Sequence, residues 1–481
     1  MSGRWSPRAR ARAKGLALCL VLSVPIAGCM VGPDYRRPPV TKPEGFKSTT
    51  ASGDAPLIAP EWWRLYREPE LDQLIATATA SNQTLQQAVA AVDQARALAR
   101  VAGSYLAPAI STNPTFTRQR TSANRRSVIS GEPVGTSATF NDWLVPIDLT
   151  YEIDVWGRVR RGLQSARAQA AASADDEAMV RLIVQTDVAQ YYYTLRLLDA
   201  QVEILAQTVA SYREQVRILS VQVKTGIASP IVLSQADALL QSTLAQQRDF
   251  ARARADQEHA LAVLCGQPAP SFSVAANPLR EVAPPEVPPG LPAMLLTRRP
   301  DVAAAEQAVV ASNAQIGVAM AAFYPTFSLA SFVGFESANL SSLANWQSRV
   351  ASIIPGVTLP IFQGGRLRAN LEATRAQHRQ TVAAYVNQVL IAYADVEDAL
   401  TDLHAYTDEI GNLRNAVTAS QEYLRMAQVQ YKIGLVDYLI VIDAERTLLA
   451  NQLALAQNAN LQVGAGIHLI KALGGGWESN H

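Results

Sequence analysis

An internal duplication constrains this chain more than any other feature of its 481 residues. At a constant offset of 208 positions, the segment from Gly157 to Gly266 aligns with a later segment without a gap. The identical pairs include Gly157-Arg158 with Gly365-Arg366, Leu163 with Leu371, Lys224 with Lys432, Gly226 with Gly434, and Gly266 with Gly474. A repeat of this length is one supersecondary unit present twice, so the chain is expected to fold as two equivalent halves.

Each copy changes from a strand pattern to a helix pattern at its Gly-Arg pair. "LTYEIDVWGRVRRGLQSARAQ" (149–169) alternates apolar and polar residues up to Val155 and becomes rich in Ala, Arg and Gln after Gly157. "VTLPIFQGGRLRANLEATRAQ" (357–377) repeats this change and shares nine identities with the first segment. We therefore predict two strand-to-helix junctions, one at Gly157-Arg158 and one at Gly365-Arg366.

Both copies predict the same order of elements: helix, β region, very long helix, tight turn, long helix. Each β region has room for two strands, which gives four strands per chain. In the first copy the elements are expected at 70–103, 109–156, 158–224, 225–229 and 230–265. In the second they are expected at 299–321, 326–363, 366–432, 433–436 and 437–473.

The very long helices carry a heptad stripe of apolar residues. At 1.5 Å per residue such a helix is about 100 Å long, so it must pack lengthwise against others. An ordinary antiparallel coiled-coil hairpin would show the same local pattern. The stripe residues are Val202, Leu205, Val209, Tyr212, Val216, Leu219 and Val223, aligned with Ile410, Leu413, Val417, Ser420, Leu424, Ala427 and Tyr431.

The strand before the first junction has one apolar and one acidic face. Ile147, Leu149, Tyr151, Ile153 and Val155 alternate with Asp148, Thr150, Glu152 and Asp154. A soluble sheet would bury the apolar face, whereas a membrane barrel would turn it to lipid. The acidic residues could bias a pore toward cations or form hydrogen bonds at the junction. Pro146 and Pro360 predict that strands are interrupted or end nearby.

Four strands are too few for a membrane barrel within one chain. The smallest bacterial barrels have eight strands, so two copies would supply eight and three copies would supply twelve. The strand count alone leaves this choice open.

The first 28 residues read as a targeting segment rather than as part of the fold. Five basic residues precede "GLALCLVLSVPIAGC", which has about 13 apolar residues, fewer than the ~20 that a spanning helix needs. "IAGC" resembles a bacterial lipobox, which implies lipidation of Cys29, and Met30 resembles the signal for outer-membrane sorting. The alternatives are a transmembrane anchor and a plain signal peptide. With Cys19 removed and Cys29 acylated, Cys265 has no disulfide partner.

Composition and motifs weigh against two large function classes. The formal net charge is +1, and the residues after position 28 hold 37 basic and 41 acidic side chains, so no nucleic-acid partner is expected. The five histidines are scattered and no P-loop or metalloprotease motif occurs, so we expect neither an enzyme nor a metal site.

Six segments in the right order resemble one family, the TolC-like outer-membrane efflux factors, in their lipoprotein branch (NodT/OprM-like). The similarity covers nearly the whole chain after Cys29. The segments are "CMVGPDYRRPP", "EWWRLYREPELDQLI", "YEIDVWGRVRR", "RRPDVAAAEQAVVASNAQIGVAMAAFYPTFSL", "LPIFQGGRLRANLEATRAQ" and "QYKIGLVDYLIVIDAERTLL".

The resemblance implies a mainly α homotrimer with a twelve-stranded outer-membrane β-barrel continued by a long periplasmic α-helical barrel. Such proteins are passive ducts without a cofactor, and an inner-membrane pump, here of resistance-nodulation-division type, works through a periplasmic adaptor. The implied domains are a signal peptide (1–28), a lipidated strap (29–69), a first repeat (70–266), a Pro-rich equatorial linker (267–298), a second repeat (299–475) and a tail (476–481).

The resemblance also implies roles for residues near the two helical turns. Gly226, Gly434 and Leu435 match the hairpin tips where the adaptor docks, although a glycine there also simply allows the helix to end. Leu439 and Asp443 match the apolar and acidic rings of a closed constriction, although Asp443 could instead be an ordinary solvated residue.

Tyr431 matches a tyrosine that latches neighbouring helices in some relatives. Val232 and Val436 stand where its acidic and basic partners would be, so this latch is not expected here.

Two other functions fit parts of the pattern. A duct of this family can also serve type I protein secretion, and a lipid-anchored periplasmic coiled-coil adaptor would explain the helical hairpins. The adaptor does not explain four strands that are distributed as two matched pairs between helices.

Overall fold

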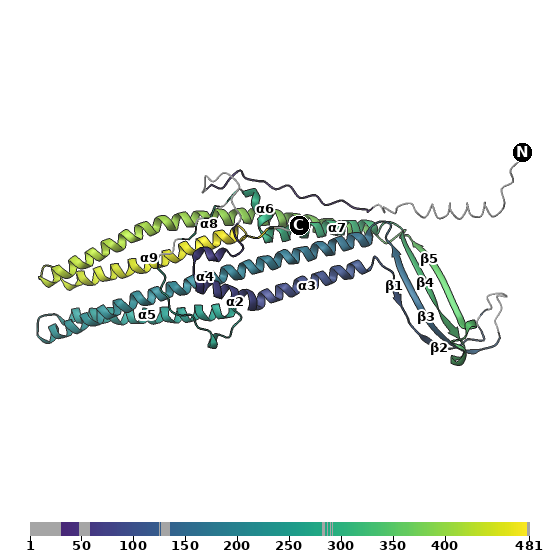
Figure 1. Ribbon diagram of the computed structural model, residues 1–481, viewed down its shortest axis with the longest axis horizontal. Coiled ribbons are helices and arrows are strands. Elements are labelled where there is room, and N and C mark those ends of the chain that lie inside the picture. Colours follow the sequence, from purple (N-terminus) through teal and green to yellow (C-terminus); the bar gives the residue numbers. More distant parts are fainter. Residues whose placement is uncertain are drawn as a thin grey trace. The chain divides into compact units, whose positions relative to one another are not determined.

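The computed structural model describes residues 30–47, 58–124, 126, 135–280, 284–285, 287–288, 290 and 292–478 (Figure 1). Cys29 and the predicted signal peptide lie outside the described residues. The chain divides into two compact units, one formed by residues up to 37, 94–170 and 307–383, the other by 38–93, 171–306 and 384–481. The first unit holds the sheet, and the second holds most of the helical hairpins.

The first unit contains one antiparallel sheet in the order β1-β3-β4-β5, with β2 also paired to β3. The strands are β1 (Ala109–Ser111), β2 (Thr115–Arg120), β3 (Thr139–Ile153), β4 (Thr326–Ser337) and β5 (Arg349–Thr358). Both β1 and β2 lie along β3, so they are two pieces of one interrupted strand. The sheet therefore has the four predicted strand positions, two from each copy.

The interruption between β1 and β2 lies opposite Pro146. Ser111 pairs with Asp148 and Thr115 with Leu144, so the break faces the residues around the proline. Proline has no N–H group to donate to a neighbouring strand. The Thr112 hydroxyl instead donates to the Pro146 carbonyl at 2.6 Å. β3 itself continues through Pro146, so the prediction of an interruption is corrected to the strand opposite; β5 ends two residues before Pro360, as predicted.

The register gives the sheet one strongly apolar face, because paired residues point to the same side. The predicted alternation in β3 is confirmed, except that Asp154 and Val155 lie beyond the end of the strand. The apolar face holds Ile110, Phe116, Trp143, Val145, Ile147, Leu149, Tyr151, Ile153, Phe327, Leu329, Val333, Phe335, Ile353 and Val357. The other face is smaller and more polar, with Asp142, Asp148, Thr150, Glu152, Ser328, Ala330, Gly334, Glu336, Ser352 and Gly356, and with Leu144, Phe332, Val350 and Ile354 as exceptions.

The helices match the predicted bounds within about two residues, with one correction. The predicted helix 70–103 is two helices, because Asn82 ends the first and its Oδ1 accepts from the Leu85 N–H at 2.9 Å, capping the second. The α-helices are α2 (Pro69–Ser81), α3 (Gln83–Ser104), α4 (Arg158–Lys224), α5 (Pro230–Leu264), α6 (Leu295–Arg298), α7 (Pro300–Ala321), α8 (Arg366–Lys432) and α9 (Tyr438–Ala472). The 3-10 helices are η1 (Trp62–Tyr66), η2 (Ala269–Ser271), η3 (Pro292–Met294), η4 (Leu340–Ser342) and η5 (Trp346–Ser348).

The heptad stripes point inward in both hairpins of the second unit. In α4, Leu205, Val209, Tyr212 and Leu219 are buried, and in α8 the aligned positions that are buried are Ile410, Ser420 and Ala427. The smaller Ser420 is compatible with packing because its hydroxyl accepts from the Asn451 side chain of α9 at 2.6 Å. The copy therefore replaces an apolar contact with an interhelical hydrogen bond.

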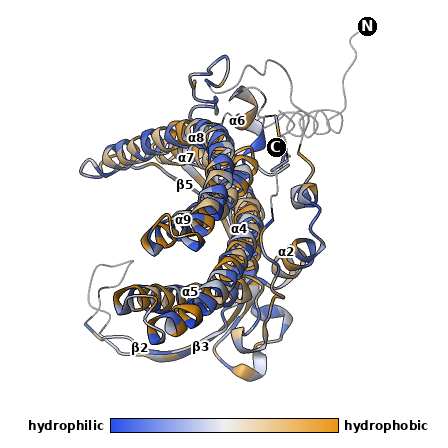
Figure 2. Ribbon diagram, turned by 90° about the vertical axis from the view of Figure 1, so that its left-hand side faces the viewer, coloured by the Kyte–Doolittle hydropathy of each residue, from blue (hydrophilic) through white to orange (hydrophobic). Residues whose placement is uncertain are grey.

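Hydrophobic and hydrophilic residues are mixed along every long helix, as Figure 2 shows for α4, α5, α8 and α9. None of the helices in the described part of the chain is both long enough and apolar enough to cross a membrane.

The largest core cluster of the second unit joins the N-terminal helices to α4. Trp62, Tyr66, Tyr192 and Tyr193 pack there with ring centroids 5.4–6.4 Å apart between successive neighbours. The Arg196 guanidinium, buried beside these rings, pairs with Glu68 at 2.5 Å. This cluster fixes the segment before α2 against the middle of α4.

Candidate functional site

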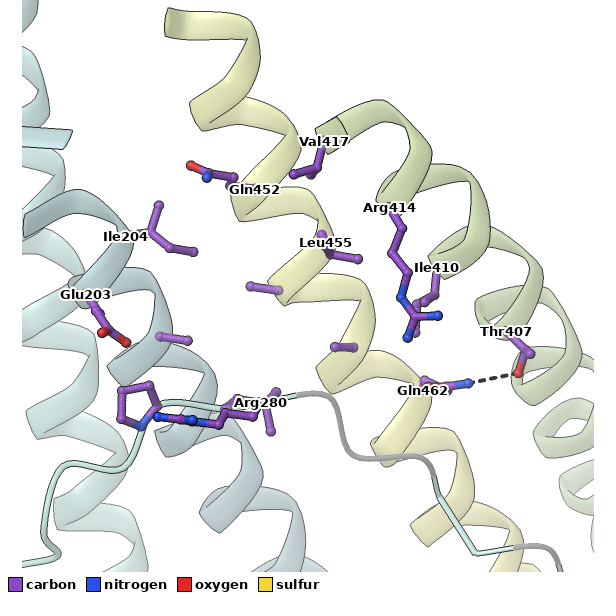
Figure 3. Close-up of a pocket in the computed structure, with 15 residues that line it drawn as sticks. Glu203, Ile204, Arg280, Thr407, Ile410, Arg414, Val417, Gln452, Leu455 and Gln462 are labelled. Atoms are coloured by element: carbon purple, nitrogen blue, oxygen red, sulfur yellow. Dashed lines mark hydrogen bonds between the residues drawn. The ribbon is translucent and has the colours of Figure 1, made fainter. Parts of the chain in front are cut away.

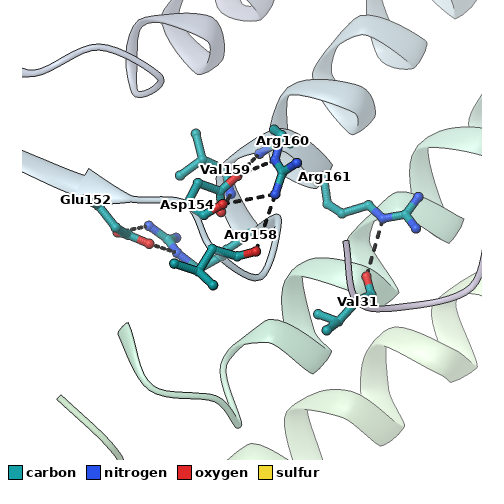
Figure 4. Close-up of polar contacts among 8 residues, drawn as sticks. Val31, Glu152, Asp154, Arg158, Val159, Arg160 and Arg161 are labelled. Carbon is teal, nitrogen blue, oxygen red and sulfur yellow. Dashed lines mark hydrogen bonds and ion pairs between the residues drawn. The ribbon is translucent and has the colours of Figure 1, made fainter. Parts of the chain in front are cut away.

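The first junction, residues 152–161, is closed by two ion pairs within one chain (Figure 4). The Asp154 carboxylate accepts from the Val159 and Arg160 N–H groups at 3.1 and 2.9 Å, and from Arg160 Nε at 3.1 Å. Glu152 binds Arg158 through both of its oxygens, at 2.8 and 2.5 Å. The carboxylate of Asp154 therefore satisfies N–H groups in the first turn of α4 that no helical carbonyl can reach.

Of the two interpretations of the acidic residues, hydrogen bonding at the junction applies to Glu152 and Asp154. Asp148 lies further into β3, on the polar face of the sheet.

The first described residues of the predicted strap, 30–37, are held at the same junction. Arg161, only 2% exposed, donates to the Val31 carbonyl at 3.4 Å (Figure 4). It also pairs with Asp34 at 2.9 Å and donates to the Gly32 carbonyl at 3.4 Å. The Val31 N–H donates to the Trp156 carbonyl at 3.1 Å. These bonds fix the chain directly after Cys29 beside Gly157, whose missing side chain leaves room for Met30.

The second junction, residues 360–369, has the same Gly-Arg pair in a different setting. Gly365 has a φ of +84°, close to the +78° of Gly157, so both junctions turn through the left-handed region that favours glycine. Arg366 donates to its neighbour Gln363 at 2.6 Å. Ile361 and Phe362 are 93% and 88% exposed.

The two hairpin tips end their first helices in the same way. Gly226 and Gly434 both have a φ of +77°. At each tip the next N–H reaches back to the carbonyl five residues earlier, from Ile227 to Gln222 at 2.8 Å and from Leu435 to Gln430 at 2.9 Å. This is a Schellman motif, in which the residue after the helix adopts a left-handed conformation that glycine allows most readily.

Apolar side chains surround both tip glycines. Ile227, Ile231, Ile433 and Leu435 are all largely exposed. Both tips therefore present apolar surface at the end of a rigid hairpin.

Leu439 and Asp443 both lie on the exposed side of α9 but face different neighbours. Leu439 lines a groove of about 700 Å³ between α5 and α9, together with Leu239 and Arg446. Asp443 accepts a hydrogen bond from the Tyr423 hydroxyl of α8 at 3.1 Å. The nearby Tyr431 donates to the Gln222 side chain of α4 at 3.4 Å.

A second groove, of about 860 Å³, lies over α9 between α4 and α8 (Figure 3). Ile204, Ile410, Val417 and Leu455 give it an apolar lining, and Glu203, Arg280, Arg414 and Gln452 add polar groups. No local sequence pattern predicts this groove, because its lining comes from four segments that are far apart in the chain.

Among the described residues, no group of three or more His, Cys, Asp or Glu side chains could hold a metal ion.

Comparison with known proteins places these features in one family. The family model for outer membrane efflux protein matches residues 74–267 and 291–475. The toluene efflux pump outer membrane protein TtgF of Pseudomonas putida is 32% identical over 479 residues, which cover 96% of this chain and 97% of that protein. The cation efflux system protein CusC of Escherichia coli is 31% identical over 476 residues, covering 97% and 99%.

Solved structures with the same fold are outer-membrane channels. The channel OprN has a TM-score of 0.86 at 27% identity, covering 93% of this chain and 99% of that one. The open state of the MtrE outer membrane channel of Neisseria gonorrhoeae has a TM-score of 0.81 at 28% identity, covering 93% and 98%.

Proposed function

The chain belongs to the outer membrane efflux protein family and is the outer-membrane channel of an efflux system; we propose that three copies assemble into one passive duct through which small molecules leave the cell. A periplasmic adaptor and an inner-membrane pump of resistance-nodulation-division type supply substrate and energy. No nucleic acid takes part.

The observation that carries assembly into a closed ring is the sheet, and the number of three copies follows from the family. Its edges are formed by β1 and β2 on one side and by β5 on the other, and one of its faces is apolar. An edge strand exposes N–H and C=O groups that lipid cannot satisfy, so a sheet in a membrane must close on itself. Pairing β5 of each copy with β1 and β2 of the next closes a sheet of twelve strand positions, with the apolar face toward lipid.

The strap supports a lipid anchor at Cys29. Because Arg161 fixes residues 31–34 at the first junction, an acyl chain on Cys29 is held close to the place where the chain enters the sheet. The lipid anchor then lies beside the end of the sheet that spans the membrane.

The exposed apolar tips support docking of the adaptor. Gly226, Gly434 and Leu435 lie at the ends of the two hairpins, where Ile227 and Ile433 add further apolar surface. A helical hairpin of a partner can cover these side chains without disturbing the turns.

Leu439 and Asp443 are proposed as the constriction. Both are exposed in one chain, and threefold symmetry would bring three copies of each together around the axis. Three carboxylates in one ring repel one another and favour a bound cation.

The relatives' names include efflux of toluene, of solvents and antibiotics, and of cations. For this chain we propose only that the exported substrates are small molecules, since the choice of substrate lies mainly in the pump. A duct for protein secretion is the second candidate, and the neighbouring genes would separate the two.

The direct test is electrical. The purified protein should migrate as a heat-modifiable trimer and form channels in planar bilayers. Replacing Leu439 and Asp443 together by Ala should raise the single-channel conductance several-fold, because it removes the side chains that narrow the passage at the proposed constriction. Unchanged conductance would contradict the assignment of Leu439 and Asp443 to the constriction. A protein that stays monomeric and forms no channels would contradict the proposed duct. Deleting the gene should increase susceptibility to pump substrates.

A further inference from the structure

Glu445 is a buried acid close to the proposed constriction, two residues after Asp443 on α9. Its side chain is 5% exposed, although charged residues are rarely buried unless they are paired. It belongs to none of the features assigned above. Its neighbours Ala444 and Val441 are buried in the cluster that joins α9 to α4 near the tips.

The partner of Glu445 lies on the other hairpin. The Gln215 amide of α4 donates to Glu445 Oε1 and accepts from the Tyr438 hydroxyl at 2.5 Å. Tyr438 and Glu445 are seven residues apart, so they lie on the same face of α9. One amide of α4 therefore holds α9 at two successive positions, and we call this contact the seam.

The seam leaves polar groups unsatisfied. Glu445 Oε2 and the buried Tyr212 hydroxyl of α4 have no hydrogen-bond partner. The titratable groups around Glu445 are Tyr212 on α4, Tyr438 and Arg446 on α9, and Tyr431 on α8, whose ring packs 5.1 Å from that of Tyr438. Among the described residues none forms an ion pair with Glu445, so the buried carboxylate, when charged, has only one amide to stabilise it.

We propose that Glu445 is a proton-controlled latch: the protonated side chain keeps α9 closed on α4, and loss of the proton loosens the seam. The inference rests on the proposed duct: where the helical hairpins line the passage, separating them near the tips would widen it. In this proposal, periplasmic pH controls the opening of the passage in addition to docking of the adaptor.

The direction follows from where the proton is bound. Burial raises the pKa of Glu445 from 4.5 to about 7, while the bond from Gln215 opposes this shift. In an open seam water would solvate the carboxylate, and its pKa would return toward 4.5. Between these two values the closed seam holds a proton that the open seam releases. Each unit rise in pH in this window therefore lowers the closed-to-open ratio by up to about tenfold per chain.

The first test compares channels in planar bilayers at pH 5.5 and pH 8. The wild-type open probability should rise by roughly tenfold or more over this interval. Glu445→Gln keeps the size and an acceptor for Gln215 but cannot ionise, so it should stay closed at both pH values. Glu422→Gln is the matched control, because Glu422 is exposed on α8 and pairs only with Arg425; it should behave as the wild type.

A second variant tests the contact itself. Gln215→Leu removes the bond that lowers the pKa of Glu445, so the midpoint of the pH response should move to higher pH. The latch is overturned if Glu445→Gln keeps the wild-type pH response, or if the wild type shows none.

A labelling assay separates failure of the latch from failure of the duct. Ala444→Cys places a thiol in the seam, and its reaction with a water-soluble maleimide is measured with and without Glu445→Gln. The labelling rate of the chain without Ala444→Cys is first subtracted, because it reports the buried Cys265. The ratio of the two corrected rates at each pH then cancels the common pH dependence of the thiol. A ratio that rises about tenfold from pH 5.5 to 8 supports the latch even if no channel conducts, and a constant ratio overturns it even if channels conduct normally.

Discussion

The two strand-to-helix junctions share a Gly-Arg pair and a left-handed glycine, yet only the first is completed within one chain. At the first junction Asp154 caps α4 and Glu152 binds Arg158. The aligned positions in the second copy are Phe362 and Pro360. The position that holds the capping residue Asp154 in the first copy thus holds the exposed Phe362 in the second.

This difference shows how a duplicated unit can acquire two roles. The first junction also binds the strap through Arg161, whereas the aligned residue of the second junction is Ala369. Large apolar side chains that are exposed together mark a surface that another molecule covers. The second junction, with Ile361 and Phe362, is therefore expected to be completed by the neighbouring copy in the trimer.

The largest contrast is expected between two glycine substitutions. Gly157→Ala places a Cβ 3.1 Å from Met30 Cα in a left-handed conformation, whereas Gly365→Ala has the same conformation with nothing within 4 Å. The first should lower the free energy of unfolding by about 3 kcal/mol and the second by about 1 kcal/mol. Urea unfolding of both variants in detergent measures this. Equal losses would mean that the strap does not pack on the junction in solution.

Removal of the cap should have the next largest effect. Asp154→Ala removes the side-chain acceptor of two N–H groups of α4 and of Arg160 Nε, although Arg160 still donates to the carbonyls of residues 154 and 155; the change should cost about 2 kcal/mol of unfolding free energy. Asp154→Asn keeps an acceptor oxygen and should lose about half as much. If both variants are as stable as the wild type, the junction does not depend on this carboxylate.

Phe362→Ser should affect assembly rather than folding. In one chain the side chain is solvated, so the isolated subunit should unfold as before. In the trimer each buried ring contributes about 1.5 kcal/mol, and the trimer should dissociate at a lower temperature on gels. A trimer of unchanged heat stability would place this side chain outside the subunit contact.

The smallest effects are expected at the two arginines. Arg158 is 44% exposed in its pair with Glu152, and such a pair contributes about 0.5 kcal/mol or less. Arg158→Ala and Arg366→Ala should therefore differ by no more than this in thermal unfolding. A much larger loss for Arg158 alone would indicate that its ion pair with Glu152 supports the trimer.

Some of the architecture could be predicted from residues that act locally. The 3.5-residue period of α4, the two-residue period of β3 and the glycines at 157, 226, 365 and 434 each determine the backbone near them, so their elements appeared where expected. Asn82 and Pro146 were the exceptions. Asn82 interrupted a helix through a side-chain cap, and Pro146 acted on the strand opposite rather than on its own.

The sequence by itself determined the repeat and the order of its elements, because these are written in periodicity and in residues with special backbone conformations. The resemblance to the family came from six quoted segments. Only the tertiary structure decided that Arg161 holds the strap, that Phe362 stays exposed while Asp154 is a cap, and that Glu445 is buried against Gln215. The contacts of Arg161 with the strap and of Glu445 with Gln215 join residues more than a hundred positions apart, so local sequence patterns do not show them. In the sequence Glu445 follows Asp443 as one more acidic residue of an amphipathic helix, and nothing there distinguishes the one that is buried.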